Sequence, residues 1–364
     1  MKTLIRNFSH TFRRFFTASV LNIVGLAIAF ASFFVIMTQV DYDYNFNKGY
    51  KDYEKIFRVE VHANDEYGWQ VWLARPFCEL VQSTSPHITS LSILTSYSSS
   101  FDYEVNGKLF NEKTLTGFGN FMETFQPEMI NGTADALKQP GNILIPQTMA
   151  IRFFGTTDVV GQTIFQGKRA DNNPVTVGGV YKDFPENSQI RNTIFKALAP
   201  NENKDNWSNW NYHCYIRIDN PEEAGNIEKA TVQKLMEFFP DLMDENNVDC
   251  PIHLTPLTDV HFSTIGDKSA SSRTTVYLLI CVSFLIVIIA TINFMNFSLA
   301  ETPMRIRSIN TQKVLGATTR SLRGSLIAES ALISFIAFLL SLVLVLALRD
   351  SGMQDLVASD LSFG

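Results

Sequence analysis

The residues that most often carry enzyme chemistry are scattered along this chain of 364 residues. The two closest histidines, His253 and His261, lie eight residues apart in the stretch IHLTPLTDVHF, which Pro256 interrupts. Histidine pairs that bind zinc are usually separated by three to five residues, so we interpret these two as surface or core histidines. The sequence contains no GxxxxGK(S/T) phosphate loop, no HExxH zinc motif and no GxSxG nucleophile motif. We therefore predict no enzyme, and no catalytic, cofactor-binding or metal-binding residues in this chain.

The cysteines do not form a disulfide framework either. There are four, at Cys78, Cys214, Cys250 and Cys281, and no two of them make a CxxC pair. Cys281 lies in an uncharged apolar run, which leaves an odd number elsewhere. Small disulfide-stabilised domains carry an even set at short spacings. We expect at most one bridge among the other three cysteines, and the sequence does not select the pair.

One segment does combine residue types that suit binding. Residues 304–323, MRIRSINTQKVLGATTRSLR, carry five basic residues and no acidic one. Gly316 is placed like the first residue beyond a helix C-terminus, and Lys313 lies in the last turn before it. Thr318 or Thr319 can then cap a second helix that follows. We predict a short helix, a sharp break and a longer helix.

The apolar residues of this segment suggest a partner. Ile306, Ile309 and Leu315 are candidates for one face together with Lys313, and Val314 lies beside them. An anionic lipid surface is one partner, since each basic residue near it contributes about 1 kcal/mol. A groove on a cytoplasmic protein is the other. Composition alone favours lipid slightly, but lipid contact needs no Gly-Ala break directly after Val-Leu, and this break favours the protein.

Long apolar runs surround this segment. A helix rises about 1.5 Å per residue, so about 20 apolar residues cross a hydrocarbon core of about 30 Å. The first run is longer than the apolar part of a signal peptide and lacks a small-x-small cleavage site, so we expect it to be retained. Glu329 is the one charged residue in the third run. We predict transmembrane helices at residues 18–40, 274–300 and 326–348.

Charge predicts the orientation of these helices. Residues 1–17 carry four basic residues and no acidic one, and residues 301–325 carry five basic residues and one acidic one. Because positive loops stay in the cytoplasm, we place both segments there, and residues 41–273 and 349–364 outside. Apolar residues at helical spacing among the arginines also predict that 1–17 is an amphipathic interfacial helix. The net charge of −6 sums two opposite faces, and we expect no nucleic-acid partner.

The outer region mixes two periodicities. Alternating apolar residues predict strands, and apolar residues three or four apart predict helices. The strands are expected within 55–63, 173–185 and 212–220, and the helices within 148–155 and 227–240. The predicted fold class is therefore an α-helical membrane protein with three transmembrane helices plus a large mixed α+β extracytoplasmic domain.

Taken together, these segments resemble a known family. The stretch RIRSINTQKVLGATTRSLRGSLIAES, between two spans, is similar to the cytoplasmic loop of MacB/FtsX-type ABC transporter permeases, although SINTQ replaces the usual acidic residue and glycine. NILIPQTMAIRFFGTTDVVGQTI, VTVGGVYKDFPENSQI and LTPLTDVHF resemble the ectodomain of that family, and the chain looks most like the Bacteroidetes branch. Such units have four spans, so we expect this chain to be truncated before the fourth transmembrane helix. Within the loop, the matching residues are Lys313, Leu315, Gly316, Ala317 and Glu329.

The resemblance implies a permease subunit in the bacterial inner membrane, with a MacB-like periplasmic domain at 41–273. A separate cytoplasmic ABC ATPase dimer would bind the ATP, dock on segment 301–325, and drive export or mechanotransmission through movement of the ectodomain. The further partners implied are a second permease half or a second copy of the chain, membrane lipids and a periplasmic partner. The cargo, which the family leaves open, is a peptide, a lipoprotein, a small toxic molecule or a signal. The implied ATPase-coupling residues are Arg305, Arg307, Lys313, Val314, Leu315, Gly316 and Ala317.

Two questions stay open at this point. Glu329 is either a structural intramembrane residue, paired with Arg323 or Arg320, or a participant in coupling. The chain as a whole has an alternative function as a membrane-anchored periplasmic sensor or ligand-binding protein without an ATPase partner. A sensor normally carries a cytoplasmic output domain, and a plain anchor has no need of the KVLGAT sequence.

Overall fold

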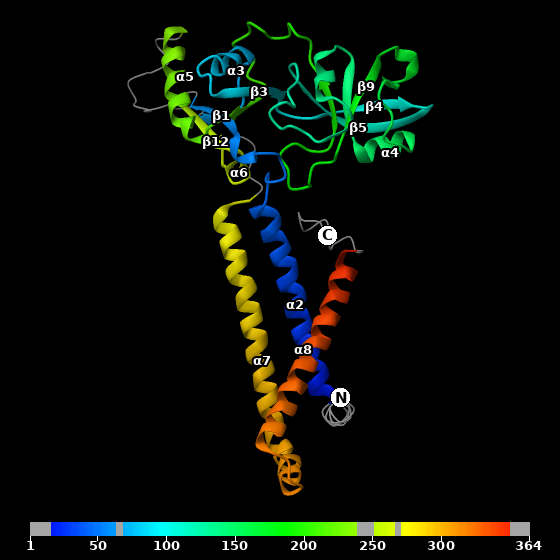
Figure 1. The fold of residues 1–364 in the computed structure, drawn as a ribbon, viewed down its shortest axis with the longest axis vertical. Helices are drawn as coiled ribbons and strands as arrows, with labels where there is room; N and C mark the ends of the chain where they lie inside the picture. Colours follow the sequence, from blue (N-terminus) through cyan, green and yellow to red (C-terminus); the bar gives the residue numbers. More distant parts are fainter. Residues whose placement is uncertain (1–15, 63–67, 239–250, 266–270, 350–364) are drawn as a thin grey trace. The chain divides into compact units, whose positions relative to one another are not determined.

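Three long helices contain the apolar runs of the sequence: α2 (Phe16–Tyr44), α7 (Arg273–Val314) and α8 (Thr319–Arg349) (Figure 1). The computed structural model describes residues 16–62, 68–238, 251–265 and 271–349. The stretches long and apolar enough to cross a membrane are Ser19–Tyr44, Arg273–Ala300 and Thr319–Arg349. The predicted fold class is confirmed. The amphipathic helix predicted at 1–17 lies outside the described residues, apart from its last two.

The helices form one unit, in which α2 packs against both α7 and α8. Its small core consists of Ile23, Leu26 and Ala27 from α2 and Ala337 from α8. Many other apolar side chains of these helices, among them Ile28, Leu285 and Phe335, are exposed. That pattern fits lipid as the solvent, because a hydrocarbon environment accepts apolar side chains while the helix satisfies its own backbone hydrogen bonds.

Helix α7 continues well past the predicted end of its span. The sequence indicated a separate short helix before Gly316, whereas the structure has one continuous helix of 42 residues. At about 1.5 Å per residue this helix is roughly 63 Å long, about twice the thickness of a hydrocarbon core. Pro303 lies inside it. A proline inside a helix removes one backbone hydrogen bond, and the helix continues past it.

A second unit is formed by residues 45–272. Its centre is a 12-stranded sheet with the order β10-β7-β9-β8-β4-β5-β3-β11-β1-β12, in which β2 pairs with β1 and β6 with β9. The strands are β1 (Ile56–His62), β2 (Trp69–Gln70), β3 (Ile88–Thr95), β4 (Ser99–Val105), β5 (Lys108–Gly117), β6 (Met129–Gly132), β7 (Asn142–Pro146), β8 (Thr163–Gln166), β9 (Pro174–Tyr181), β10 (Ile194–Ala197), β11 (Tyr212–Ile218) and β12 (Ile252–Pro256).

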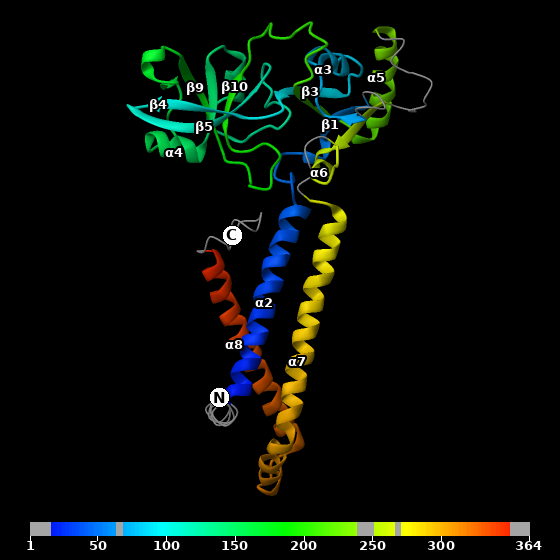
Figure 2. The ribbon, with the colours of Figure 1, turned by 180° about the vertical axis from the view of Figure 1, so that it is seen from behind.

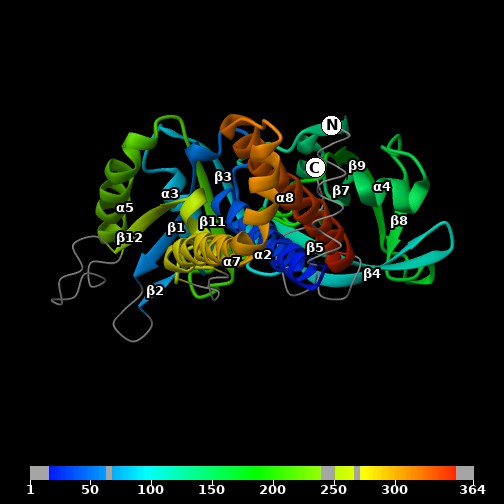
Figure 3. The ribbon, with the colours of Figure 1, turned by 90° about the horizontal axis from the view of Figure 1, so that it is seen from below.

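Helices cover this sheet in two places. At the end with β1, β3, β11 and β12, α3 (Arg75–Gln82) and α5 (Ala224–Phe238) close one apolar core (Figure 2). At the other end, α4 (Gln147–Phe154) packs on β7 and β9. A short helix, α6 (Leu257–Val260), follows β12. Viewed from below, the two groups of strands lie at opposite ends of the sheet (Figure 3).

The local predictions for this unit are confirmed. Strands β1, β9 and β11 lie within the three segments predicted to be extended. Helix α4 matches the first predicted helix, with Gly155 in the left-handed conformation at its C-terminus. Helix α5 matches the second over its described length and buries Ile227, Thr231 and Leu235 as its periodicity predicts. Phe238, which the periodicity places on the same face, is instead exposed at the end of the described helix.

Two cysteines meet in the core beneath α3. Cys78 on α3 and Cys214 on β11 are both buried, free thiols. Burial raises the pKa of the Cys78 thiol well above its usual value, and a hydrogen bond with Cys214 raises it further. Cys250 lies outside the described residues. Of the three cysteines among which the sequence allowed one bridge, Cys78 and Cys214 are therefore two neighbouring buried thiols that are not bridged in this structure.

These thiols are expected to resist alkylation. Both thiols are buried, and the nucleophile is the thiolate, which the raised pKa of Cys78 disfavours. At pH 8, Cys78 and Cys214 should therefore react with N-ethylmaleimide at least 100-fold more slowly in the folded protein than after denaturation. Ser100→Cys, an exposed position on β4, supplies the matched control and should label quickly. Mass spectrometry of the labelled peptides measures both rates. Rapid labelling of Cys78 in the folded protein would contradict its buried, protonated state.

Candidate functional site: the turn between α7 and α8

The turn after α7 is a Schellman motif. Gly316 has a φ of 91°, a left-handed conformation that glycine adopts without steric cost. The N–H of Gly316 donates to the carbonyl of Lys313 at 3.0 Å, and the N–H of Ala317 donates to the carbonyl of Gln312 at 2.9 Å. These two bonds satisfy carbonyls that the helix end would leave without a partner. The predicted break at Gly316 is confirmed.

Helix α8 begins directly after this turn. The Oγ1 atom of Thr318 accepts a hydrogen bond from the N–H of Ser321 at 3.3 Å, which is the arrangement of an N-cap residue. The N–H of Leu322 donates to the Thr318 carbonyl at 3.1 Å. Of the two threonines proposed as caps, Thr318 is the one that caps the helix. The turn is thus held on both sides by short-range hydrogen bonds.

The turn displays two aliphatic side chains. Val314 is 87% exposed and Leu315 is 81% exposed. Lys313 and Gly316 are also exposed, and Ala317 is half-buried. Exposed apolar residues rimmed by polar ones are typical of interaction sites. The structure therefore brings five of the predicted coupling residues, Lys313 to Ala317, together on one projecting turn.

The remaining predicted residues lie farther along the helices. Arg305 and Arg307 are on α7, about two turns before the turn itself. Glu329 is a half-buried residue of α8, ten residues after the first residue of that helix, which corresponds to about 15 Å. The structure does not place these three residues in the exposed turn. Their roles remain predictions.

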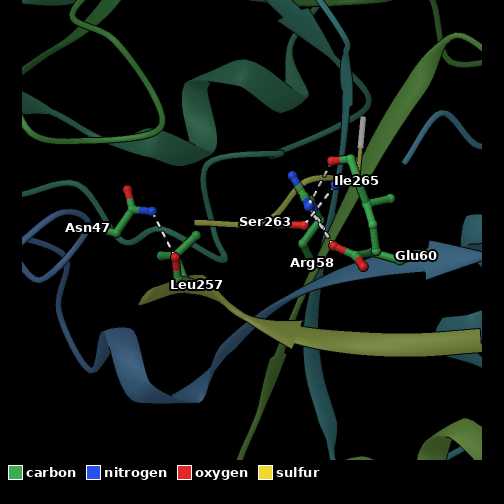
Figure 4. Close-up of polar contacts among 6 residues, drawn as sticks. All are labelled: Asn47, Arg58, Glu60, Leu257, Ser263 and Ile265. Atoms are coloured by element: carbon green, nitrogen blue, oxygen red, sulfur yellow. Dashed lines mark hydrogen bonds and ion pairs between the residues drawn. The ribbon is translucent and has the colours of Figure 1, made fainter. Parts of the chain in front are cut away.

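A second group of residues, which sequence analysis missed, lies where the chain enters and leaves the unit 45–272. Asn47 is completely buried and has a φ of 66°. Its Nδ2 donates to the carbonyl of Leu257 at 2.8 Å (Figure 4). Its Oδ1 accepts from the N–H of Gln189 at 2.6 Å. Its own N–H donates to the carbonyl of Asn187 at 2.7 Å. Three segments distant in sequence thus meet at one side chain.

Further contacts hold the exit of the chain. The ring of Phe46 stacks on that of His261, with centroids 3.8 Å apart and planes 10° from parallel. The buried guanidinium of Arg58 pairs with Glu60 through an Nε–Oε1 bond of 3.0 Å. The same guanidinium donates to the carbonyl of Ile265 at 3.4 Å (Figure 4). Apart from the Arg58–Glu60 pair, these contacts join residues far apart in the chain, so no local sequence pattern reveals them.

Two profiles of known protein families match this chain. The profile of the MacB-like periplasmic core domain matches residues 19–233, and that of the FtsX-like permease C-terminal region matches residues 280–360. The first match spans more than half of the chain, which therefore belongs to the family of MacB/FtsX-type ABC transporter permeases. The protein is a membrane permease of the ABC-transporter type, and its family works in ABC-transporter complexes.

Three solved structures are similar to part of this chain. A domain of a permease protein from Porphyromonas gingivalis is 24% identical, with a TM-score of 0.47, and the match covers 57% of this chain and 91% of that one. The periplasmic region of MacB from Actinobacillus actinomycetemcomitans is 14% identical, with a TM-score of 0.40 and coverage of 58% and 92%. The extracellular domain of the noncanonic ABC-type transporter YknZ from Gram-positive bacteria is 13% identical, with a TM-score of 0.36 and coverage of 55% and 99%. No curated protein matches the chain.

The geometry of the turn depends on Gly316. A Cβ at this position would meet no atom within 4 Å, so Gly316→Ala should cost only the left-handed backbone penalty of about 1–2 kcal/mol. The hydrogen bond from Ala317 should open correspondingly, and its amide should exchange about 5- to 30-fold faster.

Gly324 is the matched control for this experiment. It lies inside α8 with similar open space around it, so Gly324→Ala should leave the turn unchanged and favour the helix by up to about 1 kcal/mol. Hydrogen exchange of the Ala317 amide, measured in both variants, checks the prediction. Equal exchange rates in the two variants would contradict the role assigned to Gly316.

Proposed function

We propose that this chain is the permease subunit of an ABC exporter or mechanotransmission system in the bacterial inner membrane. A separate cytoplasmic ATPase dimer docks on the turn between α7 and α8, and the ATP is bound by that dimer. The observation that carries the proposal is the exposure of Val314 and Leu315 on a hydrogen-bonded turn at the end of α7. Family membership supports it, since permeases of this family work in ABC-transporter complexes.

Each residue of the turn has a part in this docking. Val314 and Leu315 fill an apolar groove on the ATPase, and burying one such side chain contributes roughly 1.5–3 kcal/mol. That amount corresponds to about 10- to 150-fold in the dissociation constant. Lys313 supplies positive charge at the rim, to which Arg305 and Arg307 add from the preceding turns of α7. Gly316 and Ala317 set the shape of the turn.

Charge supports the orientation that docking requires. The basic segments 1–17 and 301–325 place the turn in the cytoplasm, and the ectodomain lies in the periplasm. Helix α7 then runs from the docking turn through its membrane span as one helix that contains Pro303. Movement of the ATPase at one end of α7 would therefore shift the whole helix. A second permease half, or a second copy of the chain, completes the complex.

A membrane-anchored sensor without an ATPase is the competing function. In such a protein the exposed apolar turn would have no function. The basic residues alone would suit a lipid surface, but two adjacent aliphatic side chains on a fixed turn present a shape as well as a charge. The fixed shape favours a protein groove as the partner, because side chains that are already held in place lose less conformational entropy when a groove buries them.

The substitution Leu315→Asp tests the docking. In membranes that contain both proteins, the wild-type chain should co-purify with the ATPase encoded beside it and stimulate ATP hydrolysis. Leu315→Asp should insert normally into the membrane but lose at least 10-fold in capture, because a charge replaces the apolar contact.

The control variant is Asn310→Asp, which adds the same charge at an exposed position of α7, outside the turn. It should retain capture and stimulation close to wild type. Undiminished capture and ATPase stimulation by Leu315→Asp would contradict the proposal. Equal losses in both variants would instead indicate that charge on α7, and not the apolar contact, decides the binding.

A further inference from the structure

The buried side chain of Asn47 joins both connections between the ectodomain and the membrane helices. Residues 45–50 follow α2 directly along the chain, and the segment from α6 to Ile265 leads toward α7. Through its amide, Asn47 bonds to the carbonyl of Leu257 at the start of α6. The two residues are 210 positions apart in sequence. The stacking of Phe46 on His261 adds a second contact between the same segments.

A third segment, the loop 182–190, is held at the same point. The N–H of Gln189 donates to Asn47 Oδ1 at 2.6 Å, and the carbonyl of Asn187 accepts from the N–H of Asn47 at 2.7 Å. The hydroxyl of Tyr50 accepts from the N–H of Ile190 at 2.9 Å. Gly49 approaches this loop so closely that a Cβ would lie 2.6 Å from Cγ of Pro185. The loop is therefore fastened along most of its length to residues 47–50.

The other face of this loop is fastened to the distant end of the sheet. Asp183 accepts hydrogen bonds from the N–H and Oγ1 of Thr148, at the start of α4, at 3.3 and 3.2 Å. Tyr181, the last residue of β9, donates its hydroxyl proton to the carbonyl of Thr193 at 2.7 Å. The Tyr181 ring stacks on Phe195 of β10, with centroids 4.8 Å apart. The loop is thus connected to α4 through Asp183, and the strand residue just before it, Tyr181, contacts Thr193 and the β10 residue Phe195.

Only an asparagine meets all the requirements of position 47. The Leu257 carbonyl needs a donor and the Gln189 N–H needs an acceptor, and a carboxamide offers one of each. The backbone of Asn47 is left-handed, a conformation that asparagine tolerates better than most residues. Because the side chain is completely buried, water does not replace either bond.

We propose that Asn47 is the positioning residue that makes the two membrane connections move as one and transmits their displacement, through loop 182–190, to the β9–α4 part of the ectodomain. The inference rests on the proposed function, since the ATPase supplies the displacement. It extends that function by assigning the route that movement takes after it leaves the membrane helices.

The substitution Asn47→Gly tests the contribution of the Asn47 side chain separately from that of the backbone. Glycine accepts the left-handed backbone of position 47 while removing both side-chain bonds. The matched control is Asn172→Gly, the same substitution at an exposed left-handed asparagine in the turn before β9. Both variants are made in the full chain, co-purified with the neighbouring ATPase, and studied with and without a non-hydrolysable ATP analogue.

Hydrogen exchange of the peptides covering 182–193 and 147–155 is the measurement. In wild type and Asn172→Gly, the analogue should change exchange in both peptides. In Asn47→Gly, ATPase capture and stimulation should persist, but the analogue-induced change should fall at least fivefold. A purely structural role for Asn47 would raise exchange equally with and without the analogue, and would leave the difference intact.

The outcomes separate the two proposals. Capture of the ATPase by Asn47→Gly together with a wild-type response to the analogue would overturn the inference and leave the docking proposal standing. A wild-type chain that captures the ATPase but shows no analogue-induced change in exchange in the peptide 182–193 would also overturn the inference and leave the docking proposal standing. Failure of the wild-type chain to capture the ATPase would contradict the proposed function, and the inference with it.

Discussion

The absence of hydrogen-bond partners in hydrocarbon is the constraint on which the arrangement of this protein depends. A backbone that crosses a bilayer must satisfy its own polar groups, and α2, α7 and α8 do so as helices of 29, 42 and 31 residues. Because these helices are continuous, the chain can change direction only beyond the apolar runs. The Schellman turn at Gly316 is one such place, and there the backbone carbonyls of α7 find partners within the turn itself. The apolar side chains of the turn remain exposed and are left for a partner to cover.

A continuous α7 also links the two candidate sites of the molecule. One end of this helix carries the exposed Val314 and Leu315, and the other follows the segment that the ectodomain holds through Leu257, His261 and Ile265. The contacts on the ectodomain side are hydrogen bonds and a ring stacking, made by the buried side chains of Asn47, Arg58 and Phe46. Those offered at the turn are exposed and apolar. This difference suits their tasks, since a permanent joint requires satisfied hydrogen bonds and a docking surface requires apolar area that a partner can bury.

Much of this account was accessible from the sequence, because it depends on local patterns. Apolar run length predicted the three membrane helices, Gly316 predicted the end of α7, and the threonine pair Thr318 and Thr319 predicted the start of α8. What the sequence could not indicate depends on contacts between distant residues. The order of the 12 strands, the meeting of Cys78 with Cys214 and the three bonds of Asn47 belong to this class. The continuity of α7 past Ala300 was missed for a different reason, since the change from apolar to basic composition marks the membrane boundary but does not end a helix.

The central claim is that Leu315 contacts an ATPase and not lipid, and photo-crosslinking tests it most directly. Leu315→p-benzoylphenylalanine, made in the full chain and irradiated in membranes that contain the neighbouring ATPase, should yield a crosslink to that ATPase. Ile327, which is 70% exposed on α8 inside the apolar run, provides the comparison, and the same replacement there should crosslink to lipid alone. Crosslinking of position 315 to lipid alone, with the ATPase present, would contradict the account.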